Sequence, residues 1–381
     1  MDSRPVARMR EFGTTIFAEM SALAEQTGSI NLGQGFPDAD GPPEILAAAA
    51  QALAAGHNQY PPGPGIAELR AAIAHHHKRF YGLDVDIDAE VLVTAGATEA
   101  IASALLALVD DGDEVLMFEP YYDSYGASVA LARGVRRVVT LDRDGAGWTF
   151  DADRFRASVT ARTRVILLNT PHNPTGKVFS RTELQVIADV ACERDLIVIS
   201  DEVYEHLVFD GEHVPIATLP GMADRTITIG SAGKSFSVTG WKIGWATGPA
   251  ELVSAVRTVK QFLTYASGAP LQHAVAHALG LPDQYYRNAA ESLKERRDVF
   301  CGGLSRAGFD VVAPQATYFA TVSVDELAAD YCRRLPASSG VVAIPSSVFY
   351  DSTAGDHFVR FAFCKRPEVL AEAVRRLERG S

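Results

Sequence analysis

The 381-residue sequence is poor in cysteine and lacks the paired spacing of a disulfide framework or a cysteine metal site. Its four cysteines, Cys192, Cys301, Cys332 and Cys364, lie far apart and form no CxxC motif. A reducing, cytoplasmic compartment is therefore expected. Long apolar runs are also missing: stretches such as residues 100–109 are too short to span a bilayer, and no apolar signal core follows the N-terminal arginines.

Positive charge is scarce relative to negative charge. Lysine and arginine total 35 and aspartate and glutamate total 47, which gives a formal net charge of −12 at pH 7. An acidic chain repels the phosphate backbone of nucleic acids and the surface of anionic membranes, so neither is an expected partner. The net charge does not bear on small anionic substrates, because a local cationic pocket can form within an acidic protein.

Internal repeats and low-complexity linkers are absent, and the length of the chain points to two lobes with separate cores. Apolar runs without alternation predict strands buried on both faces, hence a mostly parallel sheet covered by helices in an α/β fold. The strands are expected at residues 91–94, 114–118, 164–169, 196–200, 226–230 and 241–247. A large domain is predicted at residues 41–270. The N-terminal arm 1–40 is expected to join residues 271–381 in a smaller α+β domain.

Candidate functional residues follow the strands of this predicted sheet, where ligands bind in open α/β folds. Ala95–Glu99 forms a small turn that opens a helix, and such a turn offers free backbone N–H groups to an anion. A proline-rich loop holds Asn173, and Asp201 directly follows a fully apolar strand. A buried carboxylate there needs a cationic partner such as a protonated pyridine nitrogen. An Asx turn and a helix N-cap are the simpler alternatives for Asn173 and Asp201.

Three cationic residues stand in largely apolar surroundings. Lys234 lies among small residues in Ser231-Ala-Gly-Lys-Ser-Phe, where partial burial would lower its pKa and free the amine for imine formation. Ser231 and Lys242 are available to hold a phosphate. Arg360 interrupts an apolar strand pattern, and its planar guanidinium suits a carboxylate. A solvated lysine and a structural ion pair are the alternatives for Lys234 and Arg360.

Taken together, these signals suit a pyridoxal 5′-phosphate (PLP) enzyme. The phosphate needs an anchor, the ring nitrogen an acid, the aldehyde an amine and the substrate carboxylate a guanidinium. On these motifs the sequence resembles the class I/II aminotransferases of PLP fold type I over nearly its whole length. In residues 31–38, 231–234 and 240–244 it is similar to the kynurenine aminotransferase/glutamine transaminase K group and to actinobacterial N-succinyldiaminopimelate aminotransferases. The resemblance implies a large domain with a mostly parallel, seven-stranded sheet.

The resemblance also implies a role for each candidate residue. Lys234 would bind the cofactor as a Schiff base and move a proton, and Asp201 would pair with the ring nitrogen. Tyr204 and Asn173 would hydrogen-bond the ring hydroxyl, and Arg360 with Asn173 would hold the substrate α-carboxylate. Of the remaining candidates, Gly35 would lie beside that carboxylate and Tyr122 against the ring. The phosphate would be bound by Ala97, Thr98, Ser231 and Lys242, and Tyr60 would reach the phosphate in the neighbouring subunit.

The implied reaction moves an amino group between an L-amino acid and a 2-oxo acid such as 2-oxoglutarate, in a homodimer with active sites at the subunit interface. The favoured substrate is N-succinyl-LL-diaminopimelate of lysine biosynthesis. The alternative is a kynurenine-, glutamine- or methionine-type aminotransferase, with β-elimination of cysteine conjugates as a related activity. Candidates for the wall that selects the substrate include Phe36 and residues 265–270. A PLP-dependent transcription factor is disfavoured because it would need an added basic DNA-binding domain.

Other motifs receive a structural interpretation. The run His75–His77 looks like a metal cluster, but successive helical residues point about 100° apart and do not share one face. We therefore expect a solvated helix end and no metal. Trp241, Trp245 and Cys364 are expected to serve packing.

Overall fold

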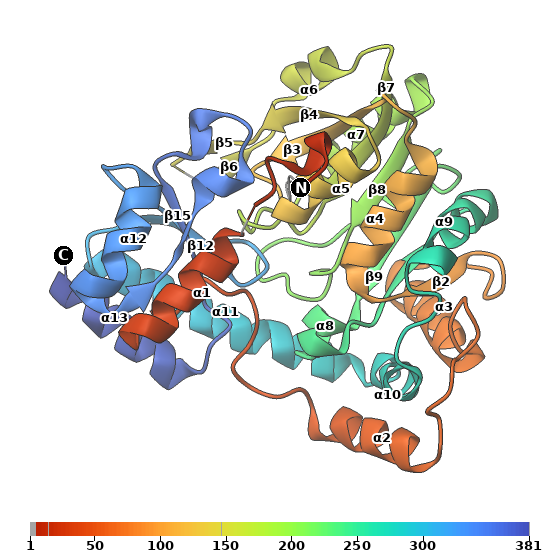
Figure 1. The fold of residues 1–381 in the computed structure, drawn as a ribbon, viewed down its shortest axis with the longest axis horizontal. Coiled ribbons are helices and arrows are strands. Elements are labelled where there is room, and N and C mark those ends of the chain that lie inside the picture. The colour runs from red at the N-terminus through yellow and green to blue at the C-terminus, as the bar shows by residue number, and fades with distance from the viewer. Residues whose placement is uncertain (1–4, 14, 146, 381) are drawn as a thin grey trace.

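The computed structural model describes residues 5–13, 15–145 and 147–380, so residues 1–4 and 14 of the predicted N-terminal arm lie outside it. Figure 1 shows one group of elements around a large sheet and a second group around a smaller sheet. Helix α1 (Ile16–Thr27) lies with the second group, beside elements from the end of the chain. The division of domains at residues 41 and 270 stays a prediction.

The large sheet has seven strands among the described residues, in the spatial order β2-β10-β9-β8-β7-β3-β4. Neighbouring strands are parallel except at β10, which runs antiparallel to both β2 and β9. This confirms the mostly parallel α/β sheet that the apolar runs predicted. The strands are β2 (Val91–Thr94), β3 (Glu114–Glu119), β4 (Val135–Thr140), β7 (Thr163–Asn169), β8 (Ile197–Asp201), β9 (Thr226–Ser231) and β10 (Gly244–Thr247).

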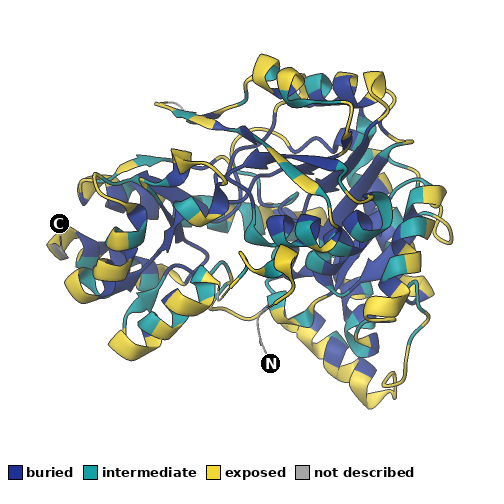
Figure 2. Cartoon of the chain, turned by 45° about the horizontal axis from the view of Figure 1, so that its top comes forward, coloured by how far each residue is buried: buried dark blue, intermediate teal, exposed yellow. Residues whose placement is uncertain are grey.

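Helices cover both faces of this sheet, which is why its strands are apolar without alternation. Along β7, Val165 and Leu167 pack into a cluster with one set of helices, whereas Ile166 and Leu168 pack into a cluster with another set. Figure 2 shows the buried strands beneath helices whose outer faces are exposed. The first set is α4 (Gly96–Leu108), α5 (Asp123–Leu131) and α9 (Ala250–Leu263), and the second is α6 (Ala152–Ser158) and α7 (Arg181–Glu193).

A third cluster of buried residues lies at the β2 edge of the sheet. It includes Ile73, Val93 and Trp245, and helix α10 (Ala269–Leu279) packs there against α2 (Pro43–Ala54) and α3 (Ala67–Tyr81). The four-residue helix α8 (Ala232–Ser235) follows β9 immediately and contributes Ala232 to the same cluster. The segment that carries Lys234 is therefore anchored to this cluster immediately after the end of β9.

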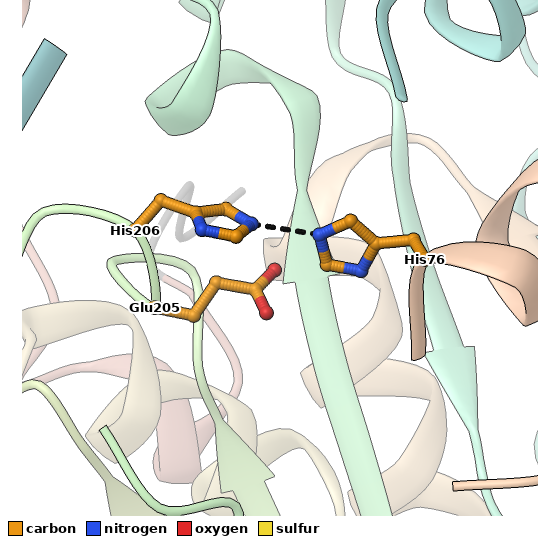
Figure 3. Close-up of side chains that lie close together, drawn as sticks. All are labelled: His76, Glu205 and His206. Atoms are coloured by element: carbon orange, nitrogen blue, oxygen red, sulfur yellow. Dashed lines mark hydrogen bonds between the residues drawn. The ribbon is translucent and has the colours of Figure 1, made fainter. Parts of the chain in front are cut away.

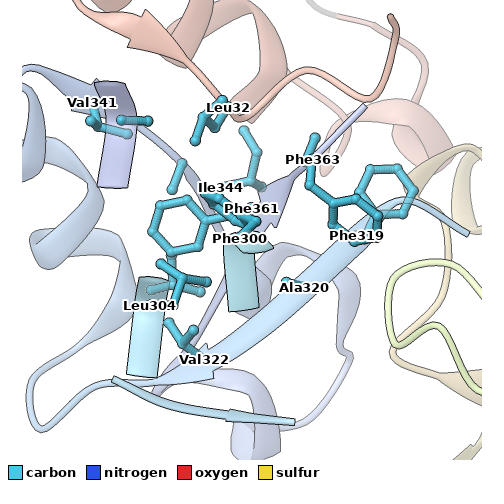
Figure 4. Packing of buried hydrophobic residues seen from close by; sticks show 14 of the residues in the cluster. Leu32, Phe300, Leu304, Phe319, Ala320, Val322, Val341, Ile344, Phe361 and Phe363 are labelled. Atoms are coloured by element: carbon cyan, nitrogen blue, oxygen red, sulfur yellow. The ribbon is translucent and has the colours of Figure 1, made fainter. Parts of the chain in front are cut away.

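The smaller sheet is antiparallel, in the order β11-β12-β15-β14, and its core joins distant parts of the chain. Figure 4 shows Leu32 near the N-terminus packed with Phe300, Leu304 and Phe361. Strand β1 (Ile30–Asn31) pairs in parallel with β13 (Val341–Val342). The other elements are β11 (Asp310–Val312), β12 (Phe319–Ser323), β14 (Ile344–Pro345), β15 (Phe358–Ala362), α11 (Asp283–Arg306), α12 (Ala328–Ser339) and α13 (Pro367–Gly380); a separate hairpin is β5 (Asp142–Asp144) with β6 (Gly147–Thr149).

The strand predicted at residues 241–247 is wrong at its start. Residues 239–241 form a 3₁₀ helix and Lys242 has a φ of 54°, in the left-handed region, so β10 begins only at Gly244. Trp245 and Cys364 are buried, as packing residues should be, but Trp241 is partly exposed. Within the described residues, no helix combines the length and the hydropathy needed to cross a membrane.

Candidate active site

A cavity of about 430 Å³ lies where the carboxyl ends of β7, β8 and β9 meet the start of α4 and the small sheet. Ligands bind at this end of the strands in open α/β sheets. The cavity brings together residues from both ends of the chain. Its walls include the predicted residues Gly35, Ala97, Thr98, Tyr122, Asn173, Asp201, Tyr204, Ser231, Lys234, Lys242 and Arg360.

Lys234 projects into this cavity from α8. Its Nζ donates a hydrogen bond to the Tyr318 hydroxyl at 3.1 Å, and that hydroxyl donates to the Gly35 carbonyl at 2.7 Å. Burial lowers the pKa of Lys234 to about 8, because removal of water disfavours the charged ammonium. A solvated surface lysine is thereby excluded, and the amine is prepared for chemistry near neutral pH.

Asp201, at the end of β8, is buried with 4% of its surface exposed. One carboxylate oxygen accepts a hydrogen bond from the Tyr125 hydroxyl and the other accepts from the Val203 amide at 3.4 Å. Burial raises the pKa of Asp201 to about 6, against the smaller opposing effect of these donors. No ion pair of the described residues includes Asp201, so its negative charge faces the cavity without a bonded cation.

Tyr125 and Asn169 were not predicted as site residues, although both order predicted ones. Tyr125 lies one turn after Tyr122 on α5, and this i, i+3 spacing was a usable signal. Asn169 donates to the Asp201 carbonyl at 2.8 Å and accepts from the Asn173 amide at 2.7 Å. It therefore fixes the loop that carries Asn173 relative to the end of β8.

Arg360 is a buried cation on β15, only 2% exposed. Its guanidinium donates to Asn173 Oδ1 at 3.2 Å and to the Gly33 carbonyl at 3.0 Å, while its Nε has no hydrogen-bond partner. The Phe319 ring lies under it at 4.1 Å. No ion pair of the described residues includes Arg360, so the structural ion pair considered from the sequence is wrong for this part of the chain. A buried guanidinium without a carboxylate is costly unless a ligand supplies one.

Close packing shapes the two ends of the cavity. A Cβ atom at Gly35 would lie 2.6 Å from the Phe319 ring that supports Arg360, so a side chain there would displace the ring. A Cβ atom at Gly244 would lie 2.8 Å from the Ala97 amide nitrogen. The absence of a side chain lets β10 approach the first turn of α4, where unpaired N–H groups and the helix dipole favour an anion. Ser231 and Lys242 line the same end of the cavity.

Tyr60 is the one predicted site residue that does not line this cavity. It is 83% exposed, and its ring packs edge-on against Tyr265 at 5.5 Å. Phe262 and Leu263 are also strongly exposed and lie two to three residues before Tyr265 in the sequence. Exposed aromatic and aliphatic residues gathered in this way are typical of a protein–protein contact.

The histidine run departs from its prediction. His76 and His77 are buried within α3, while His75 is exposed, so the expected solvated helix end is wrong for two of the three residues. Figure 3 shows His76 beside Glu205 and His206, whose nitrogen and oxygen ligand atoms lie within 4.8 Å of one another. These atoms already bond within the chain: the two Nε2 atoms are 2.7 Å apart, and Glu205 accepts from the Tyr81 hydroxyl. The cluster ties α3 to the segment after β8.

The cavity and fold can be compared with those of known proteins. The profile of the aminotransferase class I and II family matches residues 27–377. The chain belongs to this family. This aminotransferase is 54% identical to a probable N-succinyldiaminopimelate aminotransferase DapC of Mycobacterium tuberculosis, over 98% of this chain and 97% of the relative. The solved structure of the M. tuberculosis N-succinyldiaminopimelate aminotransferase matches with a TM-score of 0.97, over 99% of this chain and 100% of the other.

More distant relatives include aminotransferases that are named for other substrates. Escherichia coli methionine aminotransferase is 37% identical over 98% of this chain and 97% of the relative, and its structure matches with a TM-score of 0.94. A kynurenine–oxoglutarate transaminase of Dictyostelium discoideum is 37% identical over 97% of this chain and 95% of the relative. The chain is thus an aminotransferase of PLP fold type I, a PLP-dependent enzyme.

The residues of the cavity fit this cofactor. The first turn of α4 with Ser231 and Lys242 offers donors for a phosphate, and Tyr122 offers an aromatic face. Asp201 lacks a bonded cation among the described residues, as a partner for a ring nitrogen should. The amine of Lys234 lines the same cavity, and its pKa is lowered to about 8 by burial. The cavity therefore contains a complementary group for each polar part of PLP.

Proposed function

We propose that this enzyme exchanges an amino group between N-succinyl-LL-diaminopimelate and 2-oxoglutarate in lysine biosynthesis. The observation that carries the site assignment is the convergence of Lys234, Asp201 and Arg360 on one cavity, with none of the three in an ion pair among the described residues. The substrate assignment is supported by the 54% identical relative that bears this activity in its name.

In the proposed site, Arg360 and Asn173 bind the substrate α-carboxylate. The guanidinium is already oriented by Asn173 Oδ1 and the Gly33 carbonyl, so binding requires little reorganisation. A planar guanidinium can bind both carboxylate oxygens, which also fixes the plane of the α-carbon substituents. Gly35 leaves space for Phe319 to support the guanidinium.

When bound, PLP supplies an electrophilic carbonyl and an electron-accepting ring, which is the chemistry that the side chains alone lack. Asp201 is proposed to hold a proton on the ring nitrogen through its negative charge. Tyr125 and Asn169 keep Asp201 in place, and Tyr204 and Asn173 donate to the ring hydroxyl oxygen. The α4 turn with Ala97 and Thr98, together with Ser231 and Lys242, is proposed to bind the phosphate, and Tyr122 to lie against the ring.

Lys234 is proposed to bind the cofactor covalently and then to carry the proton that leaves the substrate Cα. Its lowered pKa leaves a useful fraction of the amine neutral near pH 8, which a proton acceptor requires. The Tyr318 hydroxyl, 3.1 Å from Nζ, orients the amine when it is free. Phe17 and Phe319 line the cavity and give it apolar walls that reduce the amount of water around the reacting atoms.

We further propose a homodimer in the cytoplasm, with Tyr60 of each subunit at the phosphate of the other subunit's cofactor. The exposed aromatic patch around Tyr60 and Tyr265 supports a contact between copies, because its rings lie outside the cavity of their own chain. Four cysteines without a disulfide support a reducing compartment.

A second candidate is a broad kynurenine-, glutamine- or methionine-type aminotransferase with cysteine-conjugate β-elimination. The aromatic part of the wall, Phe17, Phe36 and Tyr122, favours apolar or aromatic donors, and relatives with such names are 37% identical. Both candidates would use Lys234 and Arg360 in the same way.

Steady-state kinetics with 2-oxoglutarate and a panel of donors separates the candidates. The panel contains N-succinyl-LL-diaminopimelate, kynurenine, glutamine, methionine and a cysteine conjugate. The proposal requires kcat/KM to be at least about tenfold higher for the succinylated donor than for any other, a preference of ~1.4 kcal/mol. A higher value for methionine or kynurenine supports the second candidate, and pyruvate release without oxo-acid consumption supports β-elimination.

A further inference from the structure

Lys260 on α9 is a buried lysine whose role the reaction itself does not explain. It is only 1% exposed, and its Nζ donates to the carbonyl oxygens of Gly63 at 2.9 Å and Tyr265 at 2.7 Å. Among the described residues its bonded partners are thus two backbone carbonyls and no carboxylate. Burying an ammonium on neutral partners costs free energy, and its two hydrogen bonds fix the positions of these two loop carbonyls.

The two carbonyls belong to the loops that carry the exposed aromatic patch. Gly63 lies three residues after Tyr60, and the following Pro64 carbonyl is anchored to β2 by the Val93 amide at 2.9 Å. Tyr265 has a φ of 61°, which is uncommon for a residue with a side chain, and its carbonyl is oriented by the ammonium. The ammonium therefore fixes the edge-to-face packing of Tyr60 on Tyr265.

The same loop is also tied to the phosphate end of the chain's own cavity. Glu99, in the first turn of α4, accepts from the Ala95 amide at 2.6 Å and from the Thr264 hydroxyl. Thr264 immediately precedes Tyr265. A continuous set of bonds thus leads from the α4 turn through Thr264 and Tyr265 to Lys260 and the loop of Tyr60.

We infer that Lys260 is a positioning residue for the active site of the other subunit, because it holds Tyr60 and Tyr265 in the arrangement that completes that site. This inference rests on the proposed homodimer. Lys260 itself touches neither substrate nor cofactor. Its effect on catalysis passes across the interface, whereas an ordinary buried lysine acts on the stability of its own chain.

The test uses hybrid dimers of holoenzyme, purified with two different tags. In the first hybrid one subunit carries Lys234→Ala and the other carries Lys260→Met. The only functional site then lies in the Lys260→Met subunit, and it receives Tyr60 from the partner, in which Lys260 is intact. In the second hybrid one subunit carries both substitutions and the other is wild type. The only functional site then lies in the wild-type subunit, and it receives Tyr60 from the subunit that lacks Lys260. PLP affinity and kcat/KM are measured per functional site.

We expect the first hybrid to match a wild-type/Lys234→Ala hybrid within about twofold, and the second to bind PLP about tenfold more weakly, as loss of one charged hydrogen bond would cause. The reverse pattern would overturn the inference, since Lys260 would then serve its own subunit. Equal values in both hybrids would also overturn it. Failure to recover any mixed dimer would instead refute the proposed homodimer.

Two further variants guard against misfolding. Arg257→Met removes a positive charge from an exposed position on the same helix and should leave both quantities unchanged. If Lys260→Met does not fold, Tyr265→Leu at an exposed position removes the ring on which Tyr60 packs. In the two hybrids it should reproduce the same asymmetry at about threefold, and a symmetric result with Tyr265→Leu contradicts the inference.

Discussion

Two adjacent carboxylates at the end of β8 have opposite surroundings. Asp201 is 4% exposed and Glu202 is 1% exposed, so burial does not distinguish them. Both oxygens of Glu202 have partners within the chain, the Ser200 hydroxyl at 2.7 Å and His213 Nε2 at 2.8 Å. Asp201 lines the cavity and has hydrogen-bond donors but no bonded cation among the described residues. The difference that identifies the functional group is that Asp201 faces the cavity, whereas Glu202 is bonded on both oxygens inside the chain.

A similar contrast applies to the cationic side chains. Lys177 is neutralised inside the chain by Glu183 at 2.8 Å, whereas Lys234 and Arg360 in the cavity have only uncharged partners among the described residues. Buried charges that lack a counter-charge cost stability, and such costs are typical of sites that bind a charged ligand. Each prediction below tests one side of this contrast.

The largest effect is expected at Lys234. Lys234→Ala should lower kcat/KM by at least about 1,000-fold, because it removes both the covalent attachment point and the proton carrier. The unfolding temperature of the cofactor-free protein should stay the same or rise, since a buried charge is removed. Activity assays and thermal unfolding of the variant check both statements. A variant that keeps more than one tenth of the activity would contradict the assignment.

Next in size is the difference between the two neighbouring carboxylates. Asp201→Asn should lower kcat about 100-fold, because a neutral amide no longer holds a proton on the ring nitrogen. Glu202→Gln should change kcat less than about threefold but lower the free energy of unfolding by ~1–3 kcal/mol, through the bonds with Ser200 and His213. Steady-state kinetics and chemical denaturation of both variants test this difference. An equal loss of activity in the two variants would contradict the distinct roles of Asp201 and Glu202.

Arg360→Lys should lower kcat/KM about 30-fold, mainly through KM. The variant keeps the positive charge but loses the two-point contact with the carboxylate, a loss of ~2 kcal/mol. Donor titrations under single-turnover conditions measure the effect on binding and on chemistry separately. A decrease in kcat with an unchanged KM would show that Arg360 does not bind the donor.

The last prediction concerns the stability of the protein and is a dependence on pH. Burial raises the pKa of Asp201 from 3.8 to about 6, so the folded cofactor-free chain retains a proton that the unfolded chain releases. The stabilising contribution is complete below pH 3.8 and is lost as the pH rises through about 6, by at most ~3 kcal/mol. Denaturant unfolding of the cofactor-free protein between pH 4 and 7 measures it, and Asp201→Asn should lack this component.

Much of this site was predictable because its residues follow continuous apolar strands. The ends of β7, β8 and β9 placed Asn173, Asp201 and Lys234 at one edge of a parallel sheet, and Arg360 stood out as a cation in an apolar run. The edge strand β4 was missed because its first four residues alternate between exposed and partly buried, with arginines at two of these positions. Sequence spacing gave no sign of this strand's place next to β3.

Other features depend on contacts between distant segments and so could not be predicted. Tyr318 orients Lys234 from the position just before β12, and no local pattern separates it from an ordinary core tyrosine. His76 and His77 are buried because the segment after β8 and strand β10 pack onto α3, a contact that helical periodicity does not reveal. Lys260 likewise appears as one more charged residue on an amphipathic helix until its two carbonyl partners are located.

The most direct test of the central claim is to find which lysine binds the cofactor. The purified protein is loaded with PLP, reduced with borohydride to make the link to the amine permanent, digested, and mapped by mass spectrometry. We predict that the phosphopyridoxyl label lies on Lys234, that it disappears in Lys234→Ala and that it persists in Lys242→Ala and Lys260→Met. A label predominantly on Lys242, Lys260 or another lysine would contradict the account.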